Sequence, residues 1–590
     1  MSPGVPSQGQ ATGRSRRLWW WILLIVAVAV PLQITFWGQP VATHYSLLQT
    51  ARPKGADGAG GPHEWVIERR ASPPQTWHAR DINGAGVMDE LETPLGNFAR
   101  PGLRGEPKRW LVICLDGVPL GVLQNLWDRG HFREFYRPSA VVSVFPSDSE
   151  TALTTVLHVA PPAGYEHRYF DRSRNEIRAG AWVTLTGAHI PYIAALDYDP
   201  PGWAKALPYL LPRKTYRADL GRLRKQFLAS SQPVFVAHIS ASDSLLHMLT
   251  TPQVEPFLIE FEDLVRELYL DARGEFGVLV FSDHGNTQTV SRAAPLEKFL
   301  QQRGWRLRNR LEGSRDVAVP AYGLIGFIAV YCQDDATASL ARDLAVLEGV
   351  DLLVFRDSAE GTAGQAFLPV RPSKQDTAEP TIALVGPGAH LSIGQASMAV
   401  LAKGGATILG ASGPAHIAWS ADGSRFWYDA TRGDPLELLP IFAQLRARGQ
   451  LAANAAASRS AGDLPAEYQA AAGPAADADL FAATWAGHYP DAAARIRDWA
   501  TNHVQNRANI LVSLKPGYFY GAGIFQHIAR FTGTHGALDA PSSLGFAMAT
   551  RPLPAAVRLA DLLPREFLRR KNAATDKGPM NTDSKRRNEE

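Results

Sequence analysis

Short apolar runs that stop at polar residues recur through the middle of the chain. Runs of six to eight residues rich in Val, Ile, Leu and Phe are typical of strands that are buried on both faces of a sheet. The strands predicted in this way span residues 110–115, 140–145, 231–238 and 276–282.

Segments with helical spacing separate these strands. The clearest segment, residues 255–270, places its large apolar side chains on one helical face, and residues 150–157 form a shorter predicted helix. Alternation of this kind predicts an α/β fold with a mostly parallel central sheet and helices on both faces.

The N-terminal part contains an uncharged run of 20 residues, 18–37, with tryptophans at both ends. This length is sufficient to cross a hydrocarbon core about 30 Å thick. Arg14, Arg16 and Arg17 precede the run, so the positive-inside rule leaves the N-terminus in the cytoplasm. We therefore expect one transmembrane helix in the inner membrane and an extracytoplasmic, periplasmic catalytic domain. A cleaved signal peptide is the alternative, but the run is longer than the usual apolar core and no clear A-x-A site follows it.

The remaining segments suggest a division of the chain around an interrupted catalytic domain. Residues 301–500 are predicted to be an inserted cap with a small βαβ unit at 323–331, 335–347 and 350–355, and residues 452–479 are alanine-rich. The predicted divisions are a cytoplasmic N-terminus and anchor at 1–38, a linker or lead-in at 39–104, the first catalytic part at 105–300, the cap at 301–500, the closing catalytic segment at 501–566 and a disordered tail at 567–590.

Overall composition narrows the classes of partner. The formal net charge of the 590 residues is +3, which gives no reason to expect a nucleic-acid-binding surface. The two cysteines, Cys114 and Cys332, both lie in apolar runs and are predicted to be buried thiols, not members of a disulfide framework or a thiolate metal site.

Polar residues with catalytic chemistry collect where the predicted strands end. Asp116 directly follows the first strand, and Ser149 lies at the start of a predicted helix, where unpaired N–H groups favour an anion. Taken alone, a strand-end aspartate and a helix-capping serine are also ordinary features of an α/β core. Two ligand pairs follow the later strands, namely Asp243 with His247, four positions apart, and the adjacent Asp283 and His284.

These motifs together resemble the alkaline phosphatase superfamily, and most closely its type I phosphodiesterase/nucleotide pyrophosphatase branch. In order, the chain carries Leu115-Asp-Gly117, Phe145-Pro-Ser-Asp-Ser149, Asp243-Ser-Leu-Leu-His247, Ser282-Asp-His-Gly285 and Gly533-Thr-His-Gly536. The resemblance implies an alkaline phosphatase-like fold and a hydrolase that uses Ser149 as nucleophile through a covalent phosphoserine. It also implies two divalent metal ions, for which zinc suits the ligands. One ion would be held by Asp116, Ser149, Asp283 and His284, and the other by Asp243, His247 and His535.

Several positions depart from the pattern of that branch. The nucleophile is a serine, whereas the branch usually has threonine, and the phosphate-binding asparagine is not recognisable in the segment 165–171. His416 competes with His535 as the last ligand, although its apolar surroundings indicate a strand, and His238 is a candidate for a supporting role beside the ligands. The expected substrate is a phosphorylated small molecule or envelope component. A phosphatase, a sulfatase and an envelope phospho-headgroup transferase are the alternatives.

Overall fold

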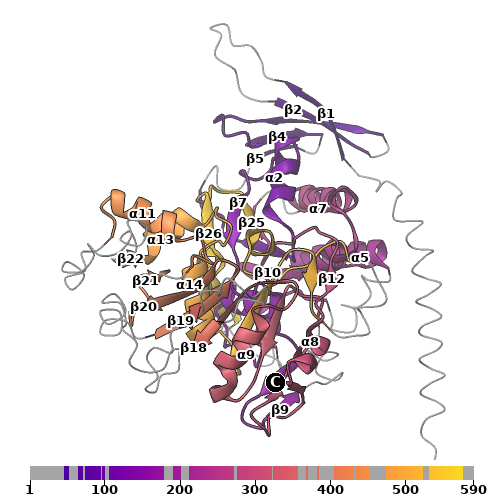
Figure 1. Ribbon diagram of the computed structural model, residues 1–590. Coiled ribbons are helices and arrows are strands. Elements are labelled where there is room, and N and C mark those ends of the chain that lie inside the picture. Colours follow the sequence, from indigo (N-terminus) through magenta and orange to yellow (C-terminus); the bar gives the residue numbers. More distant parts are fainter. Residues whose placement is uncertain are drawn as a thin grey trace, which may run out of the picture.

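The computed structural model in Figure 1 contains three large β-sheets. It describes residues 45–51, 64–70, 73–94, 96–99, 105–178, 190–200, 211–271, 275–321, 323–356, 367–369, 382–384, 404–430, 433–451, 474–501, 503–521 and 531–575.

The central sheet has six strands, of which five run in the same direction. Parallel pairing joins the first three strands in the sheet order, and β25 is antiparallel to both of its neighbours. The sheet order is β10 (Val234–Ile239), β6 (Trp110–Leu115), β11 (Gly277–Phe281), β25 (Leu544–Ala549), β7 (Ser139–Val142) and β26 (Ala556–Arg558). The predicted α/β fold with a mostly parallel central sheet is confirmed.

Helices cover both faces of this sheet because its inner strands are apolar on both sides. In β6, Leu111 and Ile113 point toward one helical layer, whereas Val112 and Cys114 point toward the other. The first layer contains α2 (Leu120–Asp128), α5 (Pro212–Ala229), α6 (Ala241–Met248) and α7 (Thr251–Asp271). The second contains α3 (Ser149–Val156), the short 3₁₀ helix η1 (Pro191–Ala195), α16 (Leu559–Leu562) and α17 (Arg565–Thr575).

A second sheet, called the lateral sheet here, contains seven antiparallel strands from the predicted cap and beyond. Its order is β15 (Phe327–Val330), β23 (Ile510–Leu514), β16 (Val350–Arg356), β19 (Gly404–Gly410), β20 (Gly413–Trp419), β21 (Arg425–Asp429) and β22 (Ala475–Ala476). One face packs against α8 (Leu296–Gln302) and α9 (Thr337–Leu344), and the other against α11 (Leu439–Ala447), α13 (Asp477–Thr484) and α14 (Ala492–Thr501).

The predicted βαβ unit is present in the lateral sheet, with an unexpected strand inside it. Both β15 and β16 are antiparallel to β23, so they are parallel to each other with β23 between them. The segment 501–566 therefore divides between two sheets, because β23 belongs to the lateral sheet and β25 to the central one. The prediction had assigned the whole segment to the catalytic domain.

Short elements complete the described chain. They are β8 (Tyr169–Asp171), β9 (Glu176–Arg178), β12 (Arg292–Ala293), β13 (Arg306–Leu307), β14 (Asp316–Val317), the 3₁₀ helix η4 (Asp334–Ala336), β17 (Phe367–Pro369), β18 (Ile382–Leu384), β24 (Tyr518–Phe519) and α15 (Ala540–Ser543).

The segment predicted to be a linker or lead-in instead forms an N-terminal sheet, which lies at the top of Figure 1. Strands β2 and β3 alternate buried and exposed residues, and Trp65, Ile67, Trp77 and Ala79 form the sheet's own small core. This alternation was present in the sequence but was obscured by the surrounding glycines and prolines. The antiparallel strands are β1 (Tyr45–Ala51), β2 (Glu64–Arg69), β3 (Gln75–Arg80), β4 (Glu90–Thr93) and β5 (Gly96–Ala99).

Both ends of the chain bear on the sequence predictions. The tail expected to be disordered from residue 567 begins as helix, because α17 continues to Thr575 and the Phe567 ring packs edge-on against Trp110 with 5.7 Å between ring centroids. Within the described ranges, no helix has the length and apolarity required to span a bilayer. The predicted transmembrane run 18–37 lies outside those ranges.

Candidate metal centre and nucleophile

Three neighbouring parallel strands bring aspartates to one edge of the central sheet. Asp116 follows β6 and Asp283 follows β11, while Asp243 lies in the first turn of α6, just after β10. Because β10, β6 and β11 are adjacent and parallel, their carboxyl ends meet at the same edge. Asp116 and Asp283 are buried, and the Asp243 side chain is 15% exposed. The sheet therefore concentrates negative charge at this edge.

Ser149 is the first residue of α3, and its hydroxyl points toward this carboxylate edge. Its Oγ donates a hydrogen bond to Asp116 Oδ1 at 3.1 Å and lies 3.2 Å from His284 Nε2. The preceding Asp148 is the N-cap, because its side chain accepts from Glu150 N at 3.0 Å and from Thr151 Oγ1 at 2.9 Å. Asp148 thus fixes the start of the helix and leaves the Ser149 hydroxyl at the helix N-terminus.

A first group of potential ligand atoms surrounds the serine. One atom each from Asp116, Asp243 and His284 lie within 4.8 Å of one another. His284 Nε2 is 3.4 Å from Asp116 Oδ1 and 3.6 Å from Asp283 Oδ2, so Asp283 adjoins the same group. Asp116, Asp283 and His284 were predicted to form this set. Asp243 was predicted only for the other set, but it lies in this group as well.

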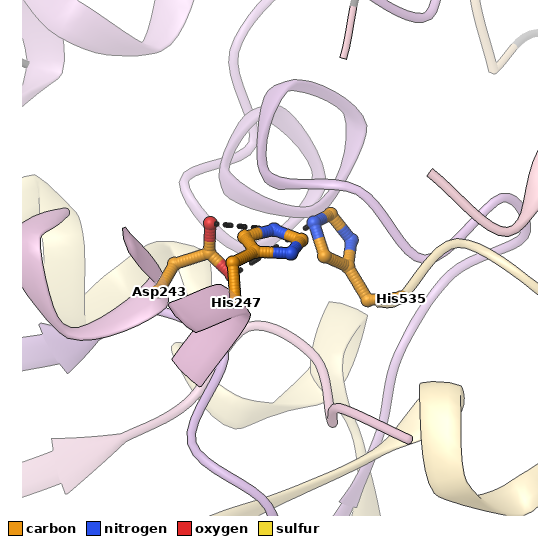
Figure 2. A group of neighbouring side chains, drawn as sticks. All are labelled: Asp243, His247 and His535. Atoms are coloured by element: carbon orange, nitrogen blue, oxygen red, sulfur yellow. Dashed lines mark ion pairs between the residues drawn. The ribbon is translucent and has the colours of Figure 1, made fainter. Parts of the chain in front are cut away.

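A second group consists of Asp243, His247 and His535, whose side chains converge in Figure 2. His247 Nε2 is 3.2 Å from Asp243 Oδ2, and His535 Nε2 is 3.8 Å from Asp243 Oδ1. The other nitrogen of each ring contacts a backbone carbonyl: His247 Nδ1 is 2.9 Å from Gly533 O, and His535 Nδ1 is 2.8 Å from Ser147 O. A carbonyl accepts only from N–H, so both contacts assign the proton to Nδ1 and leave Nε2 available as a ligand.

The donor atoms fit a bound cation. Asp243 Oδ1 and Asp283 Oδ2 are buried carboxylate oxygens that accept no hydrogen bond from the described residues. Burying such an oxygen without a partner is costly, and a metal ion would satisfy it. Carboxylate oxygens and imidazole nitrogens are the ligand types that zinc accepts.

The carboxylates also give the site a negative potential, which favours a positive charge there. Burial favours the neutral imidazole, but Asp283 and Asp116 outweigh it and raise the pKa of His284 to about 10. Burial and the neighbouring Asp116 raise the pKa of Asp283 to about 6. His535 stacks on His284 with ring centroids 3.9 Å apart, and burial together with His284 lowers its pKa to about 3. His535 is thus held neutral, the form that ligates a metal.

Gly117 explains the glycine in the Asp-Gly motif. Its φ of +72° is a left-handed conformation that residues with a side chain rarely adopt, and its N–H donates to Asp283 Oδ1 at 3.2 Å. A Cβ at this position would lie 2.6 Å from Asp243 Oδ1. The glycine therefore allows Asp116 and Asp243 to approach the same space.

The remaining histidines separate into different roles. His238 Nε2 lies 2.9 Å from Asp116 Oδ2, which places it directly behind the carboxylate, as its candidate supporting role required. His416 lies on β20 of the lateral sheet, opposite Thr407 and Asp429, and belongs to neither ligand group. His158 Nε2 contacts the carbonyl of Leu563.

One residue that supports the candidate site, Arg495, was not predicted from the sequence. Arg495 on α14 is 4% exposed, and its guanidinium hydrogen-bonds within the loop before Ser149 and the loop after His535. Its acceptors are the carbonyls of Val144, Pro490 and Leu538 and the hydroxyls of Ser147 and Ser543. Arg495 is one of two arginines in an alanine-rich helix, and nothing in the sequence distinguishes it for this role.

Comparison with known proteins gives only distant similarities. No protein-family model and no curated protein matches the chain. Among solved structures, human ectonucleotide pyrophosphatase/phosphodiesterase 5 is 11% identical over 78% of this chain and 95% of its own, with a TM-score of 0.37. The murine protein in complex with AMP is 12% identical over 78% of this chain and 95% of its own, with a TM-score of 0.36. Phosphonoacetate hydrolase from Sinorhizobium meliloti 1021 with phosphonoformate is 11% identical over 81% of this chain and 97% of its own, with a TM-score of 0.35.

Proposed function

We propose that this protein is a metal-dependent hydrolase of phosphoesters, similar to phosphodiesterases and nucleotide pyrophosphatases. The observation that carries the proposal is the position of Ser149. Its hydroxyl lies at a helix N-terminus, 3.1 Å from Asp116 and 3.2 Å from His284, beside two groups of ligand atoms that share Asp243. A nucleophile, an anion-binding helix end and a paired metal centre are the components that phosphoryl transfer requires.

Ser149 would attack the phosphorus atom of the substrate. The bond from Oγ to phosphorus forms while the bond from phosphorus to the leaving oxygen breaks, which gives a phosphoserine. The hydroxyl proton of Ser149 is lost to solvent and the departing alkoxide takes one up from solvent, so the alcohol leaves neutral. Asp116 Oδ1 accepts the hydroxyl hydrogen bond and orients Oγ. The N–H of Ser149, at the start of α3, would bind a phosphoryl oxygen, since the next N–H, that of Glu150, already donates to Asp148. Water then attacks phosphorus, and the bond to Oγ breaks to release the acid and regenerate the serine.

Two zinc ions are the cofactor we propose. One would be held by Asp116, Ser149, Asp283 and His284 and the other by Asp243, His247 and His535, with Asp243 close enough to serve both. When bound, such a pair stabilises the serine alkoxide and the leaving oxygen. Three carboxylates and three imidazoles suit zinc better than magnesium, which prefers oxygen ligands alone.

Replacement of the nucleophile tests this proposal directly. The full chain carrying Ser149→Ala is expected to lose phosphodiester turnover by on the order of 10³-fold or more while it still binds zinc. The matched control is Thr155→Ala on the same helix, whose hydroxyl donates only to the Thr151 carbonyl. Steady-state kinetics and zinc content are measured on both variants. Wild-type turnover in Ser149→Ala would remove the serine from the mechanism.

The preferred ester is the finer part of the proposal, and we assign it to diesters or phosphonate esters. A dianionic monoester usually needs an arginine or a further cation to stabilise its extra charge. Within the described part of the chain, the best-placed arginine, Arg495, directs its hydrogen bonds to carbonyls and hydroxyls behind the serine. The kcat/KM values for bis-p-nitrophenyl phosphate, a phenylphosphonate ester, p-nitrophenyl phosphate and p-nitrophenyl sulfate decide between the classes. A monoester or sulfate preference above about tenfold, roughly 1.4 kcal/mol, would favour the phosphatase or sulfatase alternative.

The headgroup-transferase alternative and the cellular location belong to the same proposal. We place the catalytic region outside the cytoplasm, anchored by residues 18–37, because three arginines precede that uncharged run. The substrate would then be a phosphorylated small molecule or envelope component. A reporter enzyme fused after residue 570 that is active only in the cytoplasm would contradict the location, and transfer of the phosphoryl group to an added alcohol in preference to water would favour the transferase.

A further inference from the structure

Strand β10 carries one polar side chain in an otherwise apolar sequence. The strand reads Val-Phe-Val-Ala-His-Ile, and His238 is 1% exposed. A buried imidazole costs free energy unless its nitrogens are satisfied, so its partners show what it does.

Both ring nitrogens of His238 contact carboxylates. Nε2 lies 2.9 Å from Asp116 Oδ2, and Nδ1 lies 2.8 Å from Asp199 Oδ1. The Tyr192 ring approaches edge-on with a centroid distance of 6.2 Å and an interplanar angle of 90°. The imidazole is therefore fixed in orientation by contacts on three sides.

The backbone places Asp199 beside His238. His238 N donates to Tyr198 O at 2.9 Å and Asp197 N donates to Val236 O at 2.7 Å, so residues 197–199 run alongside β10. The Asp197 side chain accepts from Val236 N at 2.7 Å and secures the same segment. Asp199 thus reaches the buried histidine from a segment tied to the strand at several points.

The two carboxylate oxygens of Asp116 have different main partners. Oδ2 is held by His238, whereas Oδ1 is the nearer oxygen to the Ser149 hydroxyl, at 3.1 Å against 3.4 Å for Oδ2, and lies 3.4 Å from His284. A carboxylate held at one oxygen cannot rotate to chelate an ion through both oxygens without breaking that contact. Hydrogen-bonded partners of this kind orient metal ligands and influence metal affinity.

We propose that His238 and Asp199 are positioning residues that fix Asp116, so that Oδ1 is the oxygen nearer the nucleophile and the one left to bind the metal. This inference rests on the proposed function in that it assumes Asp116 is a ligand. His238 itself is not a ligand, because a carboxylate oxygen lies within hydrogen-bond distance of each ring nitrogen.

The test uses the full chain and measures both zinc binding and kinetics. His238→Ala is expected to raise the dissociation constant of one of two zinc ions by about 10–100-fold and to lower kcat, with KM nearly unchanged. His238→Gln keeps an amide donor near the Nε2 position and should restore most of the affinity. Asp199→Asn should have a smaller effect in the same direction, because it can still accept from Nδ1.

The matched control is His131→Ala, which removes another histidine paired with a buried carboxylate, Glu262, at 2.8 Å. It should leave zinc affinity and kcat unchanged. Wild-type zinc affinity and kcat in His238→Ala would overturn the proposal, as would equal losses in His131→Ala. Loss of a whole zinc equivalent in His238→Gln would make His238 a ligand and also overturn it. If wild-type protein binds zinc but hydrolyses no ester, the proposed reaction fails, while the zinc affinities still test the positioning role.

Discussion

The central and lateral sheets have similar numbers of strands but opposite strand patterns. In the central sheet, adjacent parallel strands β10, β6 and β11 all end at one edge, and Asp243, Asp116 and Asp283 follow them there. In the antiparallel lateral sheet, successive strands end at opposite edges, so consecutive loops cannot combine in this way. A parallel sheet is the pattern that gathers ligands from distant parts of a sequence.

The lateral sheet nevertheless contributes to the candidate site, through the segment after β23 and through helix α14. The segment that follows its strand β23 carries His535 before the chain enters β25 of the central sheet. Helix α14, which packs on the lateral sheet, supplies Arg495 to the loops on either side of the serine and His535. The central sheet therefore carries most of the predicted ligands, while the segment after β23 of the lateral sheet carries His535.

The largest effect should come from replacing His535, with His416 as the comparison. His535→Ala removes an Nε2 ligand and is expected to cost one zinc equivalent and more than about 100-fold in kcat. His416→Ala, on the lateral sheet, should retain both ions and the wild-type rate. Zinc content measured by atomic absorption together with kinetics checks both variants. Zinc loss in His416→Ala with none in His535→Ala would reverse the assignment.

A smaller effect is expected from replacing Arg495, which lies between the two sheets. Arg495→Met leaves the buried Val144 and Leu538 carbonyls without this donor and should lower the free energy of unfolding by about 3 kcal/mol. It should also weaken zinc binding at the His535 group about tenfold, since Ser147 contacts both Arg495 and His535.

Denaturant titration and zinc affinity measure these two effects of Arg495→Met. The control is Arg497→Met on the same helix, which loses an ion pair with Asp498 and a hydrogen bond to the Gly423 carbonyl, and it should leave zinc affinity unchanged. A stability loss in Arg495→Met with normal zinc affinity would confine the lateral sheet to supporting the fold.

The smallest effect concerns the glycine between the aspartates. Gly117→Ala introduces a Cβ 2.6 Å from Asp243 Oδ1 and should lower zinc affinity several-fold. Gly84→Ala is a matched control, because its φ of +74° imposes similar backbone strain of about 1–2 kcal/mol but nothing lies within 4 Å of the added carbon. Calorimetric zinc titration compares them, and equal affinities would show that the Asp243 contact is easily relieved.

Much of the central sheet, and the residues that converge at its carboxyl edge, could be predicted because their signals are local. Apolar runs that end at Asp116 and Asp283 indicate both a strand and a candidate ligand, and the apolar face predicted for residues 255–270 is buried, although α7 begins four residues earlier, at Thr251. All seven predicted site residues lie in or beside the two ligand groups. The sequence favoured His535 over His416 as the last ligand because His535 lies in a predicted turn, whereas His416 lies in a predicted strand.

The errors have a common physical origin in interactions between distant segments. The N-terminal strands are short and half-exposed, so their alternation is weak beside the surrounding glycines and prolines. Arg495 and Asp199 act through backbone neighbours that only the folded chain provides. The placement of β23 between β15 and β16 is a matter of strand order, which residue patterns do not encode.

The contact between His247 Nδ1 and the Gly533 carbonyl joins residues 286 positions apart. During synthesis, Asp243 and His247 therefore emerge long before His535. The group of three side chains stays incomplete until residue 535 has been synthesised. His535 follows β23 in the chain, so its arrival also depends on closure of the lateral sheet. If the proposed ion binds here, it can be held by all three residues only after residue 535 has been made and β23 has joined the lateral sheet.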